Sequence, residues 1–585
     1  MPFNNLHALA RTLAALGFTL VLATCASAPP SASRGEGLVV AANPHAVAAG
    51  TEMLRQGGSA TDAAIAAMLV LGLVEPQSAG LGGGGFLLAY EERTRTLDAY
   101  DGREIAPAGA RADMFLVDGA PMPFLDAQQS GLSIGAPALM PMLHMAHAQH
   151  GRLPWRDLFA PAIALADNGF AVSPRLHRLI AAYAERGRLR DQPDARAYLF
   201  TPDGAPLPVG HVLRNPAYAA TLRALAAEGP RALTEGRLAA DIVAAAQRAP
   251  RAGSLSLTDV AAVRPRRIDP LCRRFRVYRV CTMAPPSAGG FAVLEILGLY
   301  ERARPAPVGP DNVDDWAAFL WASRLAYADR DFFGGDDQFV PVPTRALTSR
   351  PYLDARARLI DLAHAPDTVT HGEPGRRAAL PAASRFALGA GYEENGTTHL
   401  SVVDADGNVA ALTATVESAF GSQRMAGGFF LNNQLTDFSF MPTRDGLPAA
   451  NAVGPGRRPR SSMAPTIVFE PDGDVFAAIG SPGGGAIIAY VARTIIGVTD
   501  WNLSMQGAID LGHVIAAGPN VRSEAARVPS PLAAALRARG WQLRDTDSEE
   551  SGLHGFVRRG AAWDAGADPR REGAVARIAP TQPAN

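Results

Sequence analysis

The sequence contains no lysine, and all 55 of its basic residues are arginine. A Walker A phosphate loop, a Ser-x-x-Lys nucleophile and a Schiff-base cofactor site each need a lysine, so these three classes of protein are excluded. Arginine stays protonated at ordinary pH and cannot replace lysine as a nucleophile or base. It can bind a carboxylate through two parallel hydrogen bonds, so carboxylate recognition remains open to these side chains.

Cysteine and net charge are also scarce. Three cysteines and no His-Glu-x-x-His motif leave no ligand set typical of a zinc site, and we expect no metal and no other cofactor. A net charge of −1 over 585 residues gives no basic face for a nucleic acid. The length suits several average domains or one large fold with an extensive apolar core.

Residues 1–28 have the order of an export signal: a basic start, an apolar run over 13–23 and a small-residue cleavage site at 26–28. The apolar run is shorter than the roughly 20 residues that span a bilayer, and a buried N-terminal helix is the structural alternative. The residues before Cys25 also resemble a bacterial lipobox, and Pro29 would hinder cleavage after residue 28. We therefore expect export to the periplasm, either as a free protein or anchored through a lipid on Cys25.

The other two cysteines, Cys272 and Cys281, flank a run that alternates like a strand. An oxidising compartment would permit a disulfide across this run. Two buried free thiols fit the sequence equally well, so both readings stay open.

Hydrophobic periodicity predicts a helix-rich first part and a second part that opens with strands. Helices are expected at about 45–55, 62–71, 138–246 (with loops at 191–208), 316–363, 487–496 and 531–539, and strands at 37–42, 87–90, 400–404, 409–416, 428–431, 466–470 and 475–479. The segment 371–394 shows no clear hydrophobic periodicity, which predicts an exposed linker. This pattern favours sheets covered by helices, an α+β layered fold.

The string from Asn395 to Asp404 carries the most informative chemistry. A threonine hydroxyl is a weak nucleophile, but it is activated when the threonine is the first residue of a chain and its own α-amine takes the proton. The α-amine has a pKa near 8, so part of it is neutral at physiological pH. Attack of the Thr397 hydroxyl on the Gly396 carbonyl would cut the chain there and expose Thr397 as the nucleophile.

The same stretch resembles the gamma-glutamyltransferase family, whose pattern runs Thr-Thr-His-x-Ser, Gly-Asn, Thr-x-Thr-x-(Asn or Glu) and Phe-Gly. The matching residues are Thr397-Thr398-His399, Ser401, Gly407-Asn408, Thr413, Thr415, Glu417 and Phe420-Gly421. Further matches are Val74-Glu75-Pro76, Gly82 to Phe86, Arg103-Glu104, Pro285 to Gly290, Tyr327-Ala328-Asp329-Arg330 and Ala567-Asp568-Pro569-Arg570. The resemblance extends from about residue 37 to 574.

The resemblance implies a four-layer αββα sandwich of N-terminal-nucleophile hydrolases, built jointly by two autocleavage fragments. These would be a large subunit, 29–396, and a small subunit, 397–585, associated as a heterodimer. The implied roles are: Thr397 as nucleophile and Thr415 as its hydrogen-bond partner; Gly483 and Gly484 as oxyanion donors; Arg103, Ser461 and Ser462 for an α-carboxylate; Glu417, Gln434 and Asp437 for an α-ammonium.

The implied activity is that of a gamma-glutamyltransferase and glutathione hydrolase, with water or an amino acid or peptide as acceptor. A cephalosporin or glutaryl acylase of the same fold is one alternative, and the carboxylate- and ammonium-binding residues argue against it. A non-catalytic exported binding protein is another, and the intact nucleophile and glycine pair argue against that. The sequence departs from the family where Leu511-Gly512-His513-Val514 replaces Pro-Arg-x-His, in the lid loop, which has no tyrosine, and at Arg460, where leucine is usual.

Two other features have competing interpretations. Gly131-Leu132-Ser133-Ile134-Gly135 matches the Gly-x-Ser-x-Gly elbow of serine hydrolases, but no helix start follows it, which disfavours Ser133 as a nucleophile. His399 is interpreted as a histidine of the core or of the nucleophile's strand rather than as a proton-transfer group. The glycine run 82–85 is interpreted as a tight turn, since it lacks the residues of a phosphate loop.

Overall fold

The computed structural model describes residues 35–185, 187–375, 396–444 and 446–579. The expected export signal, Cys25 and most of the predicted linker at 371–394 therefore lie outside the described residues. Within the described ranges, no helix is long and apolar enough to cross a membrane.

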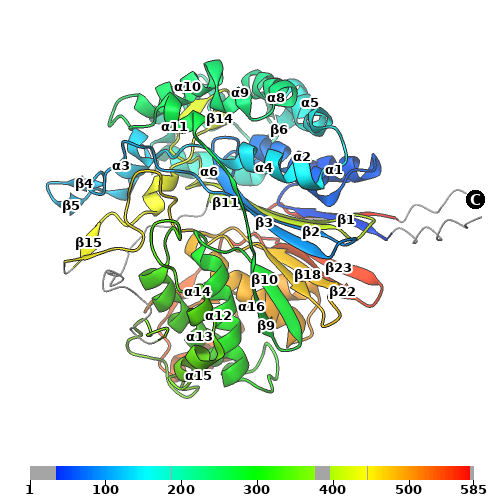
Figure 1. Ribbon diagram of the computed structural model, residues 1–585, viewed down its shortest axis with the longest axis vertical. Coiled ribbons are helices and arrows are strands. Elements are labelled where there is room, and N and C mark those ends of the chain that lie inside the picture. Colours follow the sequence, from blue (N-terminus) through cyan, green and yellow to red (C-terminus); the bar gives the residue numbers. More distant parts are fainter. Residues whose placement is uncertain (1–34, 186, 376–395, 445, 580–585) are drawn as a thin grey trace, which may run out of the picture.

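Two antiparallel sheets form the centre of the molecule (Figure 1). In spatial order, the first consists of β24 (Ala574–Ile578), β1 (Gly37–Ala41), β11 (Gly396–Val403), β12 (Val409–Glu417), β2 (Gly84–Glu91), β3 (Thr96–Gly102) and β8 (Arg266–Ile268). The second consists of β23 (Ala562–Ala567), β22 (His554–Arg559), β18 (Val475–Gly480), β17 (Thr466–Phe469), β10 (Tyr278–Thr282) and β9 (Leu271–Phe275). The first sheet thus interleaves strands from both sides of the predicted cleavage point.

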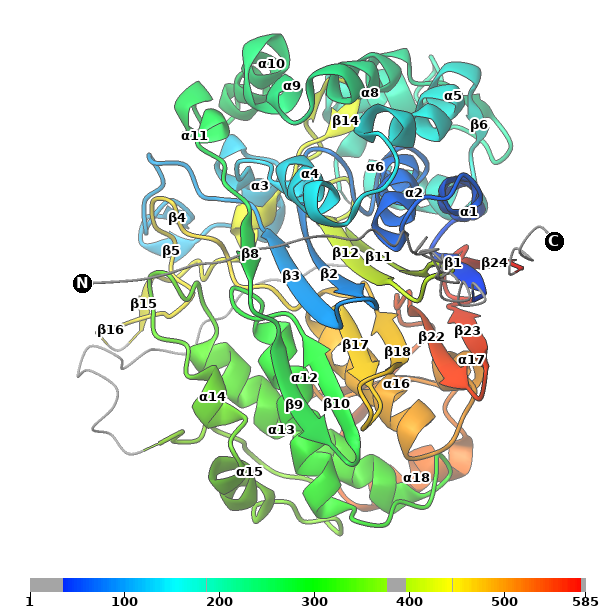
Figure 2. The same cartoon turned by 45° about the vertical axis from the view of Figure 1, so that its right-hand side comes forward.

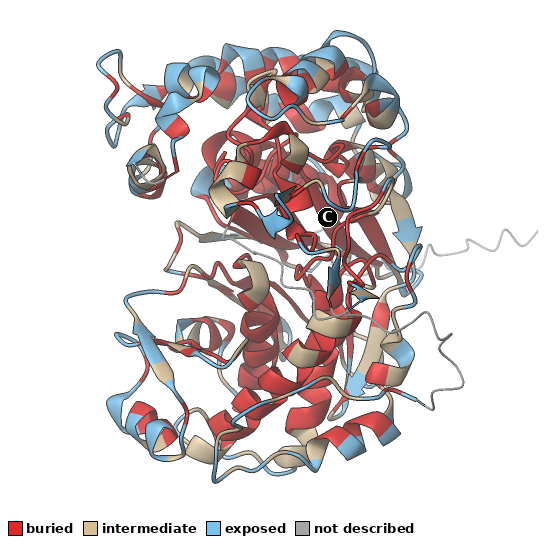
Figure 3. Cartoon of the chain, turned by 90° about the vertical axis from the view of Figure 1, so that its left-hand side faces the viewer, coloured by how far each residue is buried: buried red, intermediate tan, exposed pale blue. Residues whose placement is uncertain are grey.

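The sheets lie face to face, with helices on both outer faces (Figures 1 and 2). Side chains of a strand alternate between its two faces, and β1 shows the result. Leu38 and Val40 share a core with Ile467 of the second sheet. Val39 and Ala41 share another core with the helices above. Figure 3 shows that the sheets and the helices next to them are buried, whereas the outermost helices are partly exposed.

The helices form two groups. The first sheet is covered by α1 (Pro44–Arg55), α2 (Ala60–Val74) and α4 (Leu139–His150), with α3 (Phe124–Gln128), α5 (Ala160–Asn168), α6 (Pro174–Glu185), α7 (Pro193–Leu199), α8 (Pro216–Glu228), α9 (Arg231–Thr234), α10 (Gly236–Gln247) and α11 (Leu257–Ala261) in the same half. The second sheet is covered by α12 (Ala288–Ala303), α16 (Ile487–Thr499) and α17 (Met505–Asp510). In the same half, α13 (Val313–Phe333) packs on α12, together with α14 (Thr344–Leu347), α15 (Arg350–Ala357) and α18 (Ser530–Ala538).

The α+β prediction is confirmed, and most element boundaries differ from it by a few residues. The predicted helix at 62–71 is longer, because Ser59 and Asp62 form a capping box that starts α2 at residue 60. The predicted strand at 428–431 is confirmed as β14 (Phe429–Phe430), which is shorter than predicted and pairs with β13 (Met425–Ala426) in a hairpin. The glycine run 82–85 was interpreted as a tight turn, but only its first half follows a turn, and Gly84 and Gly85 are the first residues of β2.

The remaining strands are short and lie outside the two main sheets. They are β4 (Leu116–Val117), β5 (Ala120–Pro121), β6 (Phe170–Ala171), β7 (Val212–Leu213), β15 (Thr443–Arg444), β16 (Leu447–Pro448), β19 (Val514–Ile515), β20 (Val521–Glu524) and β21 (Leu543–Thr546).

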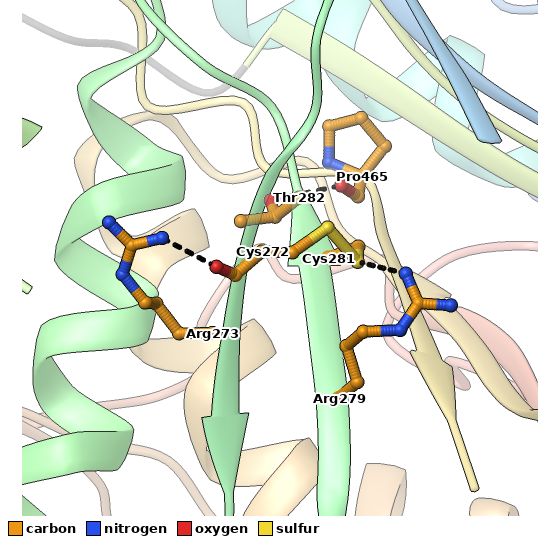
Figure 4. The surroundings of a disulfide bond; sticks show 6 residues. All are labelled: Cys272, Arg273, Arg279, Cys281, Thr282 and Pro465. Atoms are coloured by element: carbon orange, nitrogen blue, oxygen red, sulfur yellow. Dashed lines mark hydrogen bonds between the residues drawn. A yellow bond between two sulfur atoms is a disulfide. The ribbon is translucent and has the colours of Figure 1, made fainter. Parts of the chain in front are cut away.

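Cys272 and Cys281 face each other across the β9–β10 hairpin and are joined by a disulfide (Figure 4). The Cys272 carbonyl accepts a hydrogen bond from the Arg273 guanidinium, and Cys281 is fully buried. The sequence left open a disulfide or two free thiols, and the structure shows the disulfide.

Candidate active site

Thr397 lies on β11, directly opposite Thr415 on β12. The Thr397 hydroxyl donates to Thr415 Oγ1 at 3.0 Å, and the Thr415 hydroxyl donates to the carbonyl oxygen of Gly396 at 2.8 Å. The backbone N–H of Glu417 also donates to Thr415 Oγ1, at 2.8 Å. One buried hydroxyl therefore connects the predicted nucleophile with the carbonyl that it would attack.

The backbone is irregular at this point. Gly396 pairs with Glu417 and Thr397 with Thr415, so the register of β11 and β12 shifts between Gly396 and Thr397. A Cβ atom on Gly396 would lie 2.1 Å from the Glu417 carbonyl oxygen, so only glycine fits there. Glu417 has a φ of 82°, in the left-handed region that most side chains avoid. Distortion of this kind gathers at functional sites, and here it surrounds the predicted cleavage point.

Arg103 follows β3 and is 1% exposed. Its guanidinium donates to the carbonyl oxygens of Pro459 at 3.1 Å and Arg460 at 2.8 Å, and to Asp437 Oδ2 at 2.5 Å. These bonds hold the side chain beside the Ser461-Ser462 pair. The Ser461 hydroxyl oxygen accepts the Met463 N–H at 3.1 Å. The predicted carboxylate-binding residues therefore lie together.

The predicted ammonium-binding residues form the adjoining side of the same cavity. Gln434 and Asp437 belong to one 3₁₀ turn, and the Gln434 amide donates to Asp437 Oδ2 at 2.6 Å. Gln434 Oε1 is buried and accepts no hydrogen bond from the described residues. One carboxylate oxygen of Glu417 accepts from the Ser418 hydroxyl at 2.6 Å and from the Asn433 amide. Two acids and an unused carbonyl oxygen suit a bound cation.

Gly483 and Gly484 form the turn between β18 and α16. Their φ values are 129° and 56°, and a Cβ atom on Gly483 would lie 2.5 Å from the Tyr490 ring. The turn stands immediately before the N-terminus of α16, where backbone N–H groups and the helix dipole favour negative charge. This is the setting that an oxyanion would need.

The fold brings these side chains into one cavity. Its lining includes Thr397, Thr415, Gly484, Arg103, Ser461, Ser462, Glu417, Gln434 and Asp437, together with Met463 and Ile487. Gly483 lines a neighbouring cleft of about 730 Å³ instead. Among the described residues, no group of three or more His, Cys, Asp or Glu side chains could hold a metal ion.

His399 and Ser133 lie outside this cavity. The His399 ring is buried between the hydroxyls of Thr413, 2.8 Å from Nδ1, and Ser401, 3.0 Å from Nε2. Burial lowers the pKa of His399 well below its usual value, and the charge of His554 acts in the same direction. Ser133 lies in a 3₁₀ turn, not at a strand-to-helix elbow, and its hydroxyl donates to the carbonyl oxygens of Gln128 and Ser130.

Three residues at the site were not assigned a role from the sequence. The Arg571 guanidinium donates to the Thr397 carbonyl oxygen at 2.8 Å, and burial lowers its pKa to about 10. Arg330 donates to Ser462 Oγ at 2.6 Å. Glu104 is fully buried beside Arg103, and burial raises its pKa to about 8. Arg330 and Glu104 belong to matched family motifs, and Arg571 directly follows one, but no motif shows what its residues contact.

The stretch 511–514, where the sequence differs from the family pattern, does not line the cavity. His513 is buried, its Nε2 lies 2.9 Å from Ser551 Oγ, and its ring packs on Tyr490, which in turn packs under the glycine turn. Arg460 is buried next to the serine pair, with its guanidinium 3.4 Å from Asp331.

Two facing sheets enclosed by helices, with a threonine on a central strand beside a glycine turn, are the arrangement that the resemblance to N-terminal-nucleophile hydrolases implies. The chain belongs to the gamma-glutamyltranspeptidase family, whose model matches residues 46–578.

Relatives of two kinds resemble the chain at similar levels. The glutathione hydrolase proenzyme of Escherichia coli (strain K12) is 35% identical over 483 residues, covering 81% of this chain and 80% of that protein. The acylase ACY 1 proenzyme of Pseudomonas sp. (strain SE83) is 32% identical over 568 residues, covering 93% and 95%.

Solved structures of both kinds, an acylase and a gamma-glutamyltranspeptidase, also resemble the chain. A cephalosporin acylase from Bacillus halodurans superposes with a TM-score of 0.81 at 25% identity, covering 96% of this chain and 99% of that one. The Helicobacter pylori gamma-glutamyltranspeptidase gives a TM-score of 0.53 at 29% identity, covering 56% and 91%. Both support the mixed α+β fold, and the family alone does not fix the acyl group.

Proposed function

We propose that the protein is a self-processing gamma-glutamyltransferase and glutathione hydrolase. It would cleave γ-glutamyl amide bonds through a γ-glutamyl ester on Thr397 and pass the acyl group to water or to an amino acid or peptide. The observation that carries the proposal is the pairing of opposite charges next to Thr397. Arg103 and two serines lie directly beside Asp437, Glu417 and Gln434, just as the carboxylate and the ammonium of an amino acid share one carbon.

Maturation would begin with attack of Thr397 Oγ1 on the Gly396 carbonyl carbon. The Thr415 hydroxyl already donates to the Gly396 oxygen, where negative charge develops. The peptide nitrogen of Thr397 leaves with a proton, giving an ester between Gly396 and the Thr397 side chain. Water hydrolyses that ester, which leaves Thr397 with a free α-amine and Gly396 with a free carboxylate.

The two fragments, 29–396 and 397–585, would remain associated as a heterodimer. β11 begins the second fragment and lies between β1 and β12 in the seven-stranded sheet, while β1 belongs to the first fragment. Separating the fragments would therefore break sheet hydrogen bonds and expose both cores.

Catalysis would use the new α-amine of Thr397 as the base. It takes the hydroxyl proton while Oγ1 attacks the γ-carbonyl carbon of the substrate, and the N–H groups of Gly483 and Gly484 stabilise the oxyanion. The leaving amine receives the proton as the C–N bond breaks. Water or an acceptor amine then attacks the ester and regenerates the hydroxyl.

Recognition of the acyl group would follow from the charges in the cavity. Arg103, Ser461 and Ser462 donate hydrogen bonds to the α-carboxylate. Glu417, Asp437 and the unused Oε1 of Gln434 accept from the α-ammonium. Glu417 stands where many family members have asparagine, and we expect its charge to tighten ammonium binding.

An acylase that accepts glutaryl or cephalosporin-type acyl groups is the second candidate. It is favoured by the acylase relative that covers 93% of the chain and by the close superposition on the Bacillus halodurans cephalosporin acylase. A glutaryl group keeps the carboxylate but has no ammonium, so it would leave the acids of the cavity without a partner.

Three chromogenic anilides separate the candidates: γ-glutamyl, glutaryl (which lacks the ammonium) and 4-aminobutyryl (which lacks the α-carboxylate). Purified protein is first run on a denaturing gel, where two fragments meeting at 396/397 are expected. The proposal requires the γ-glutamyl anilide to have the highest kcat/KM. A glutaryl preference would favour the acylase, and an uncut, inactive chain would contradict both. Thr397→Ala should abolish cleavage and activity.

We further propose that the protein is exported to the periplasm, with a lipid on Cys25 as its anchor. The Cys272–Cys281 disulfide supports export, because such bonds persist in oxidising compartments. Cell fractionation tests the location. Loss of membrane association in a Cys25→Ser variant tests the anchor, and unchanged membrane association would contradict it.

A further inference from the structure

Arg330 stands in the last turn of α13, and its side chain is nearly buried. Its Nη2 donates to the Ser462 hydroxyl oxygen at 2.6 Å, and its side chain also lines the larger neighbouring cleft. Arg330 therefore lies between the cavity that contains Thr397 and the cleft that contains Gly483.

This contact changes what Ser462 can do. A hydroxyl has one proton to donate and two lone pairs that accept. When Ser462 Oγ accepts from a guanidinium, its own proton points away from Arg330. The positive charge also polarises the hydroxyl and makes it a stronger donor. Ser461 accepts a neutral backbone N–H instead, so the two serines are not equivalent.

Arg330 is held in place by a continuous set of contacts. Its Nη1 donates to Asp331 Oδ1 at 2.7 Å, and the same oxygen lies 3.4 Å from Arg460 Nη1. The Arg460 carbonyl oxygen accepts from Arg103. Ser462 and Arg103, the two ends of the proposed carboxylate site, are thus connected through Arg330, Asp331 and Arg460.

The same face of α13 also contacts the glycine turn. Tyr327, one turn before Arg330, donates its hydroxyl proton to the Gly485 carbonyl oxygen at 2.5 Å. One helix therefore positions both the serine that would bind the carboxylate and the turn that would bind the oxyanion.

The geometry points to Arg330 as a positioning residue that sets the requirement for an α-carboxylate on the acyl donor. It directs and strengthens the Ser462 hydroxyl and adds a second guanidinium charge to that of Arg103. This inference rests on the proposed function, since it concerns the same cavity and the same acyl group.

The test uses processed protein carrying Arg330→Gln, Arg330→Lys, Ser462→Ala, and Arg330→Gln combined with Ser462→Ala. Arg324→Gln, six residues earlier on the same helix, is the matched control, because Arg324 is also buried but lines neither cavity. For each variant, kcat and KM are measured with the γ-glutamyl and the 4-aminobutyryl anilide, and thermal unfolding is recorded.

Arg330→Gln should lower kcat/KM for the γ-glutamyl anilide about tenfold to a hundredfold, mainly through KM, because one charge-assisted hydrogen-bond network is lost. Activity on the 4-aminobutyryl anilide should not change. Arg330→Lys should recover part of the loss. In the Ser462→Ala background, Arg330→Gln should have a clearly smaller effect, and Arg324→Gln should leave both substrates unaffected.

An equal loss on both substrates, or the same loss with and without Ser462, would overturn the inference and leave Arg330 as a structural residue. If Arg330→Gln prevents processing, Arg330→Lys carries the same comparison. If the wild-type protein cleaves none of the anilides, the proposed function itself fails. If the wild type prefers the γ-glutamyl over the 4-aminobutyryl anilide and the Arg330 variants keep the same preference, only the inference about Arg330 fails.

Discussion

Replacing Thr415 by valine removes the hydroxyl that connects the nucleophile to the bond it would cut, while keeping nearly the same shape. The Thr415 hydroxyl donates to the Gly396 carbonyl oxygen and accepts from the Thr397 hydroxyl and the Glu417 N–H. Thr397, Thr415 and Glu417 are all buried, so the loss of a hydrogen-bond partner is costly there. We expect Thr415→Val to slow self-cleavage and to destabilise the precursor.

The magnitude follows from the lost donor. During attack on Gly396, negative charge develops on the oxygen to which Thr415 donates, and removing one such donor costs about 2.7–4 kcal/mol of barrier. At about 1.36 kcal/mol per tenfold, cleavage should be roughly 10²–10³ times slower. The buried Glu417 N–H also loses its partner, which should lower the free energy of unfolding by about 1–3 kcal/mol.

Thr413→Val is the matched control, because Thr413 lies two residues earlier on β12 and its hydroxyl contacts His399 instead of the cleavage point. It should lose a comparable 1–3 kcal/mol of stability, again about one buried hydrogen bond. The rate of fragment formation is followed on denaturing gels from freshly refolded or freshly synthesised precursor, with thermal unfolding in parallel. Cleavage of Thr415→Val at the wild-type rate, or equal slowing in both variants, would refute the reasoning.

Three further outcomes are expected. Burial raises the pKa of Glu104 from 4.5 to about 8, with Arg103 acting in the opposite direction. The folded state therefore retains a proton that the unfolded state releases. The contribution of the neutral carboxyl to stability is full below about pH 4.5 and is lost as the pH rises to about 8. The unfolding temperature of the wild type should therefore fall relative to that of Glu104→Gln between pH 5 and 8.5. A difference in unfolding temperature that stays constant over this range would contradict the prediction. Replacing Cys272 and Cys281 by serine opens a link with a sequence separation of 9 and should cost up to about 2.6 kcal/mol in denaturant unfolding, and unchanged stability would argue against the disulfide. Ser133→Ala should cost about 1 kcal/mol through lost hydrogen bonds and leave cleavage and activity intact, and an inactive variant would restore Ser133 as a candidate nucleophile.

Local sequence predicted those features that depend on neighbouring residues. The switch to short alternating strands after Thr397, and the turn at 406–408 that joins β11 and β12, follow from periodicity and turn chemistry. The candidate site residues came from motifs rather than from periodicity, and the cavity contains all of the predicted lining groups except Gly483, which lines the next cleft.

Contacts between distant segments could not be predicted in this way. The strand predicted at 428–431 is present as β14, but its pairing with β13 was not predicted, because a short apolar run does not show which segment it pairs with. Whether Cys272 and Cys281 pair depends on strand register, which their spacing leaves open.

The sequence by itself determined the absence of lysine chemistry, the α+β pattern and a threonine that can become an N-terminal nucleophile, since each depends on composition or on residues within a few positions. Only the tertiary structure decided that Arg571 donates to the Thr397 carbonyl oxygen, that Glu104 is buried, and that Arg330 donates to Ser462, 132 residues away. Burial and charge pairing arise when distant segments meet in space, and no local pattern records which segments those are.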